Sequence, residues 1–222
     1  MRYTLLKSTG ALAAVSLMLA LNTAQAETFY FGNVSVNPVG DTVAGQFSVE
    51  VTDIGGGVVT FEFINSGPLA SSITDIYFDD GTLIEPLDSS DLAAGDVVDS
   101  VAFSVPANPP NLPGGSGSLT FNVSAGLSAD SDSPIAENGI NPGESLVITA
   151  TLKTGVTFSD IIDGILMYNG TDAGSLWIGM HVQALPDGSS ATFVTVPEPA
   201  EIALALGALL GLGAGYRRLR RA

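Results

Sequence analysis

The chain has no cysteine, one histidine and only seven lysine or arginine residues among its 222 residues. The absence of cysteine excludes disulfide bonds, a thiol nucleophile, zinc–thiolate sites and covalent attachment of a c-type haem. Few side chains remain for acid–base or nucleophilic catalysis, and no G-x-S-x-G nucleophile elbow occurs. The sequence therefore predicts a protein that is not an enzyme and that depends on its hydrophobic core for stability.

Basic residues are almost absent from the middle of the chain. Between residues 27 and 196, Lys153 is the only one, whereas 21 of the 23 acidic residues lie there, which gives this segment a formal net charge of −20. Such a charge excludes nucleic acid as a partner and repels anionic lipid. It suits a self-repelling exported domain, or one that recruits cations.

The first 26 residues have the features of a secretory signal peptide. Two basic residues among the first seven precede an apolar stretch at 10–21, which has about the length of a signal-peptide core. Ala24 and Ala26 place small residues at the positions that signal peptidase recognises, which predicts cleavage before Glu27. The apolar stretch is too short to span a membrane comfortably, which disfavours a permanent N-terminal anchor.

Residues 196–222 combine three parts in a fixed order. A proline motif comes first, and its two prolines fix their own φ angles and favour extended backbone at the residues before them. An apolar run of 15 residues at 202–216 follows, which is short for a stable membrane span. A basic end then marks the cytoplasmic side. The motif is Val196, Pro197, Glu198 and Pro199, and the basic end contains Arg217, Arg218, Arg220 and Arg221.

This arrangement resembles the PEP-CTERM sorting tail, the signal that membrane proteases called exosortases process. Residues 76–81 and 178–183 are also similar to stretches of many PEP-CTERM proteins. The resemblance implies a Gram-negative bacterium that makes exopolysaccharide, a precursor held in the inner membrane, and delivery to the cell surface or extracellular matrix. It assigns no activity to the domain. One departure is Glu201, which stands where apolar or hydroxyl residues are commoner and shortens the apolar run.

Residues 27–195 have the length of one domain and the period-two hydrophobicity of β-strands. Clusters of Gly, Pro, Asn and Asp between the strands are typical of turns. The pattern predicts an all-β fold, an antiparallel β-sandwich with a jelly roll as its close relative. One short helix is expected at 160–167 with Ser159 as its cap, and a long loop at 107–118. The expected strands lie near 28–36, 47–51, 59–63, 73–78, 97–105, 119–123, 145–152, 174–183 and 190–196.

Calcium is the metal that the acidic loops would suit, because it is bound by carboxylate and carbonyl oxygens. None of the candidate groups follows an EF-hand or RTX spacing. Each group also fits an ordinary turn or a solvated loop, so the sequence predicts no cofactor, with calcium as the alternative. The candidates are Asp75 with Asp79 and Asp80, Asp88 with Asp91, and Asp130 with Asp132.

His181 lies in an expected strand whose period-two pattern places it with Trp177 and Gln183 on a solvent-facing side. This position predicts a surface imidazole. A cleft that joined His181 to a serine and an aspartate would instead indicate a secreted hydrolase.

Four aromatic residues offer a further possibility. Exposed and coplanar, they would form a platform on which sugars stack, whereas buried they would belong to the core. The sequence thus favours a structural or interaction role linked to exopolysaccharide, with a calcium- or carbohydrate-binding module as the alternative. The residues concerned are Trp177, Tyr30, Tyr77 and Tyr168.

Overall fold

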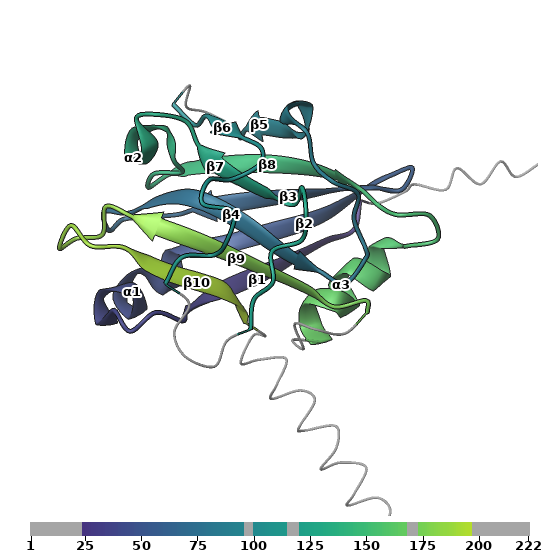
Figure 1. Ribbon diagram of the computed structural model, residues 1–222, viewed down its shortest axis with the longest axis horizontal. Coiled ribbons are helices and arrows are strands. Elements are labelled where there is room, and N and C mark those ends of the chain that lie inside the picture. The colour runs from purple at the N-terminus through teal and green to yellow at the C-terminus, as the bar shows by residue number, and fades with distance from the viewer. Residues whose placement is uncertain (1–23, 96–99, 115–119, 168–172, 197–222) are drawn as a thin grey trace, which may run out of the picture.

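The computed structural model describes residues 24–95, 100–114, 120–167 and 173–196, which form an all-β fold (Figure 1). Ten strands, all paired antiparallel, make one sheet in the order β5-β8-β3-β2-β1-β10-β9-β4-β7-β6. The longer strands are β1 (Ala26–Asn33), β2 (Phe47–Gly55), β3 (Val58–Asn65), β4 (Ser72–Asp80), β8 (Glu144–Thr151), β9 (Leu176–Gln183) and β10 (Ala191–Val196). The short ones are β5 (Leu92–Ala94), β6 (Phe103–Ser104) and β7 (Ser128–Ser131).

The sheet folds over so that its two halves face each other. The rings of Phe61 on β3 and Phe78 on β4 pack edge to face with centroids 5.3 Å apart, although four strands separate β3 from β4 in the sheet. Phe47 on β2 and Phe193 on β10 pack in the same way at 5.1 Å across β1. Such contacts require a core enclosed between two layers. The predicted antiparallel all-β fold is confirmed, with its two layers formed by one curled sheet.

Period-two alternation correctly identified the strands of one layer. On β2 the side chains of Phe47, Val49 and Val51 are fully buried, and their neighbours along the strand are partly exposed. β3 and β8 follow the same pattern. These strands have one face in the core and one in water, which is the arrangement that alternation indicates.

β4, β9 and β10 differ because both of their faces are buried. Their outer face is covered by parts of residues 107–114 and 120–127: Phe121 stacks on Trp177 with ring centroids 6.0 Å apart, and the Thr192 hydroxyl donates to the Pro113 carbonyl. Gly179 makes room for this cover, since a Cβ there would lie 2.9 Å from Leu112 Cδ2 and 3.0 Å from Phe121 Cζ. The second buried face explains why these strands are apolar on both sides.

The expected strand at 119–123 is wrong for the part that is described, residues 120–123. Their backbone does not join a ladder, because the Asn122 N–H donates to the Asp79 carboxylate at 2.8 Å and the Ser124 N–H donates to the Phe78 carbonyl at 2.9 Å. β7 pairs with β4 instead, and places Asp130 on a strand, where the sequence suggested a loop. The expected loop at 107–118 is confirmed as far as residue 114.

The described residues contain three short helices, each between two strands along the chain: α1 (Pro38–Val43), α2 (Ile135–Asn138) and α3 (Phe158–Met167). Single 3-10 turns occur at Ala44–Gln46 and Ser89–Asp91. The expected helix near 160–167 is confirmed, but its cap is Thr157, not Ser159. Thr157 and Asp160 form a capping box, in which each side chain accepts from the other's backbone N–H, at 2.8 and 3.3 Å.

The expected membrane segment at 202–216, the basic end, the prolines of the motif and residues 1–23 lie outside the described residues. Within the described part of the chain, no helix is long and apolar enough to cross a membrane.

Candidate functional site

A pocket of about 320 Å³ lies where β4, β7 and β9 meet on the covered outer face. The strand register sets Asp75 of β4 directly between His181 of β9 and Asp130 of β7. The pocket therefore collects two of the calcium candidates and the only histidine of the chain. Its lining consists of Asp75, Asn108, Pro109, Pro113, Asp130, Ser131, Ile135, His181 and Gln183.

Asp75 is the structural centre of this site. Its carboxylate is almost fully buried and accepts hydrogen bonds from the Thr74 hydroxyl at 2.7 Å and the Tyr77 hydroxyl at 3.2 Å. Oδ2 of the same carboxylate lies 3.1 Å from Nδ1 of His181. These partners satisfy a buried charge that would otherwise be costly, and they fix the orientation of the imidazole ring.

The predicted surface position of His181 is wrong. Its side chain is 15% exposed and is paired with Asp75. The period-two pattern correctly placed His181 and Trp177 on one face of β9, but Leu112 and Phe121 cover that face. A strand pattern cannot show that a distant loop folds back over the outer face.

Burial and charge change the acidity of the neighbouring groups. Burial raises the pKa of Tyr77, and the adjacent Asp75 charge raises it further, so the phenol stays protonated and donates to Asp75 and to the Pro109 carbonyl. Burial also raises the pKa of Asp130, with an opposing effect from the Asn108 N–H that it accepts at 3.2 Å and a further rise from Asp75.

The other calcium candidates are used in local hydrogen bonds. Asp80 accepts from the N–H groups of the next turn and lies 3.9 Å from Lys153 Nζ, and burial raises the pKa of both Asp79 and Asp80. Asp132 accepts from the Ser104 hydroxyl. Asp88 and Asp91 cap each other's backbone. Within the described residues, no three His, Asp or Glu side chains are placed to hold a metal ion.

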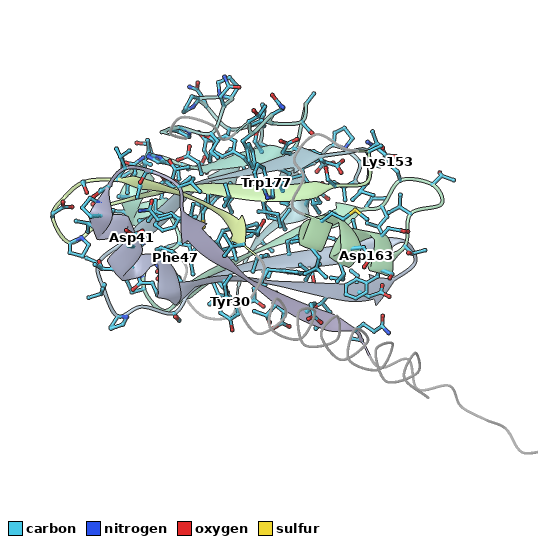
Figure 2. All side chains as sticks on the ribbon, turned by 90° about the horizontal axis from the view of Figure 1, so that it is seen from below. Tyr30, Asp41, Phe47, Lys153, Asp163 and Trp177 are labelled. Atoms are coloured by element: carbon cyan, nitrogen blue, oxygen red, sulfur yellow. The ribbon has the colours of Figure 1, made fainter. Side chains whose placement is uncertain are left out.

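The sugar-stacking platform, which the sequence left open as an alternative to core packing, does not form among the described residues. Trp177 and Tyr77 are 7% and 0% exposed, so neither presents a ring face to solvent. Tyr30 is the exposed member at 42% and lies on β1, apart from Trp177 on β9, as Figure 2 shows. Tyr168 is outside the described residues. Trp177 instead belongs to the second buried layer, which is the alternative that the sequence left open.

The serine of this pocket does not pair with His181 in the described chain. Ser131 lines the pocket, but its hydroxyl donates to the Ile135 carbonyl at 2.8 Å. No serine or threonine hydroxyl of the described residues is hydrogen-bonded to the His181 ring. The arrangement is an oriented histidine in a polar pocket, which is suited to holding a ligand through hydrogen bonds.

The residues of the predicted signal-peptidase site lie at the start of β1. Ala24, Ala26 and Glu27 are all exposed, and Ala26 already pairs with Thr52 of β2. They line a second pocket of about 510 Å³ together with Phe158, Ser159 and Ile162 of α3. At the C-terminal limit of the described chain, Val196 is the last residue of β10 and pairs with Tyr30. Val196 therefore belongs to the sheet as well as to the proline motif.

Comparisons with protein-family models, curated proteins and solved structures found no match to this chain. Its function is therefore inferred from the sequence and the geometry described above.

Calcium and magnesium are expected to stabilise the protein equally at matched ionic strength. The reason is that both ions screen the repulsion of a domain with net charge −20, and no described group of ligands selects calcium. Thermal melts in CaCl₂, MgCl₂ and NaCl measure this. Stabilisation by calcium at concentrations far below the effective NaCl range would reveal a specific site.

Proposed function

We propose that this chain is an exported protein of a Gram-negative bacterium, with a non-enzymatic structural or interaction role linked to exopolysaccharide. Signal peptidase removes the first 26 residues, and an exosortase processes the precursor at the proline motif. The product is delivered to the cell surface or the extracellular matrix. The observation that carries this proposal is the three-part tail at residues 196–222.

The position of the two strand ends supports this route. β1 and β10 are antiparallel neighbours, and Val196 lies opposite Tyr30, four residues along β1 from Ala26. At about 3.3 Å per residue, the points where the chain enters β1 and leaves β10 are offset by roughly 13 Å along the strands. The leader and the tail thus attach at the same end of this strand pair, and one membrane surface can hold both.

The end of β10 also suits a processing site. The backbone is hydrogen-bonded in the sheet through Val196, and Pro197 then lacks the N–H that continued strand pairing on both sides would use. The proline motif follows the folded domain directly, so cleavage there would leave the sheet intact.

Replacing Pro197 and Pro199 together by alanine is expected to leave the precursor in the inner membrane. The variant motif loses its pre-set extended backbone, which is the form that a protease grips. Mass spectrometry of the surface-exposed protein from the native host measures both new ends. We expect an N-terminus at Glu27 and a C-terminus near Pro197–Pro199 in the wild type.

Pro186→Ala is the matched control, because Pro186 lies in an exposed turn that precedes β10, at the end of that strand opposite Val196. This variant is expected to mature normally. Surface protein that still carries Arg217 and Arg221, or normal maturation of the double variant, would refute processing at the motif.

A further inference from the structure

We propose that the pocket between β4, β7 and β9 binds a neutral, polyhydroxylated ligand, namely one sugar residue of a polysaccharide. This inference deepens the proposed function, since it assigns the link with exopolysaccharide to particular residues. The pocket volume of about 320 Å³ lies at the small end of the range for ligand pockets. It suits a single sugar ring better than an extended segment of polymer.

The hydrogen-bonding groups of the pocket are arranged for hydroxyl groups. Asp75 engages Nδ1 of His181, and Nε2 has no hydrogen-bond partner among the described residues. The side-chain amides of Asn108 and Gln183 likewise bond to no other described residue, although both line the pocket. Each amide offers two donors and an acceptor, and the imidazole offers one further group.

Asp130 adds the charged acceptor of the site. It is partly buried, and the backbone N–H of Asn108 occupies only one of its oxygens at 3.2 Å. A carboxylate has about four lone-pair positions, so Asp130 can accept further bonds from ligand hydroxyls. Hydrogen bonds to a charged acceptor are stronger than neutral ones, which makes Asp130 the main contributor to affinity.

The negative charge of the pocket restricts which ligands can bind there. Its lining contains two carboxylates and no lysine or arginine, and Lys153, the only basic residue between positions 27 and 196, lies beside Asp80. Uronic acids, phosphates and sulfates are therefore repelled. Pro109, Pro113 and Ile135 supply apolar surface against which the C–H groups of a sugar ring can pack.

The single histidine provides a direct measurement. In the full chain, purified in a detergent without a sugar headgroup, the imidazole signals in the NMR spectrum come from His181 alone. We expect glucose, galactose, mannose or N-acetylglucosamine to shift these signals in a saturable way. Glucuronate is expected to cause no saturable shift. Asp130→Asn should weaken the binding of the active sugar by about tenfold or more.

Asp163→Asn is the matched control, because Asp163 is an exposed residue of α3 outside the pocket, and this variant should bind as the wild type does. An unchanged imidazole spectrum in the sugar-free Asp130→Asn protein would show that its fold is intact. Absence of a saturable shift with every neutral sugar, equal binding of glucuronate, or a response to CaCl₂ alone would overturn the proposal. Maturation of Asp130→Asn at the proline motif is scored separately, so failure of the pocket and failure of the sorting route are distinguishable.

Discussion

Replacing Phe78 by alanine is expected to lower the free energy of unfolding by about 3–5 kcal/mol. Phe78 is fully buried, and its ring packs against Phe61 and Phe63 at centroid distances of 5.3 and 6.2 Å. The substitution leaves a cavity between the two layers of the sheet. Urea unfolding followed by circular dichroism measures the loss.

A double-mutant cycle with Phe61→Ala tests the packing of the two layers directly. Edge-to-face aromatic pairs contribute about 0.5–1.5 kcal/mol beyond the area that they bury, so the cycle should give a coupling energy in this range. Val36→Ala is the control for an exposed apolar residue, since Val36 is 89% exposed, and it should change stability by less than about 0.5 kcal/mol. A coupling energy of zero would mean that β3 and β4 do not face each other.

The protein is expected to be more stable near pH 5 than at pH 7.5. Burial raises the pKa of Asp79, Asp80 and Asp130 above the ordinary value of 3.8. Between pH 3.8 and each raised pKa, the folded state therefore binds protons that the unfolded state releases. The stability that this proton binding provides is lost as the pH rises through that range. The general repulsion within a domain of net charge −20 acts in the same direction.

The gain in stability on lowering the pH ends at acidic pH. Hydrogen bonds from Ser90, Thr157 and Ser189 lower the pKa values of Asp88, Asp160 and Asp187, in that order. The stability that these bonds provide is present above the ordinary value of 3.8 and is lost as the pH falls through the lowered values. The stability maximum is therefore expected between about pH 4 and neutrality.

Melting temperatures across this range measure the effect, and a gain of about 2 kcal/mol would correspond to roughly 4–8 °C for a domain of this size. About 1 M NaCl shortens the Debye length to roughly 3 Å and so removes the general repulsion, which leaves the part due to burial. Asp79→Asn should flatten that remaining dependence, and Asp163→Asn should not. A stability that rises steadily from pH 5 to pH 7.5 would contradict the assignment.

The strands could be predicted from the sequence wherever one face of the strand is exposed to solvent. β2, β3 and β8 show this, because alternation along the strand reports directly which side meets water. The segment at 120–123 alternates equally well, yet its backbone bonds to Asp79 and Phe78 and not to a ladder. Alternation indicates only that every second side chain is shielded from water, and here Phe121 and Val123 are partly buried while Asn122 is exposed. A loop that lies across a sheet can meet that condition without being a strand.

Only separate parts of the candidate site could be identified from the sequence. Asp75, Asp130 and His181 were each identified from the sequence, but as members of separate groups, since 106 residues separate His181 from Asp75 along the chain. These three side chains come together because β4 lies between β7 and β9 in the sheet. Gln183 was placed on the same strand face as His181 but not as a site residue, and Asn108 was not identified. A polar residue in a loop or at a strand end indicates no site without knowledge of what faces it.

The place of β10 in the sheet also determines when this protein can finish folding. β10 is the last strand of the described chain, yet it lies between β1 and β9 and joins five strands on one side to four on the other. A chain that leaves the ribosome N-terminus first therefore completes its central pairing only after residue 196 has emerged. Until that moment two partial sheets exist with open edges, and the segment that closes them directly precedes the proline motif. Completion of the fold and arrival of the tail are thus nearly simultaneous events.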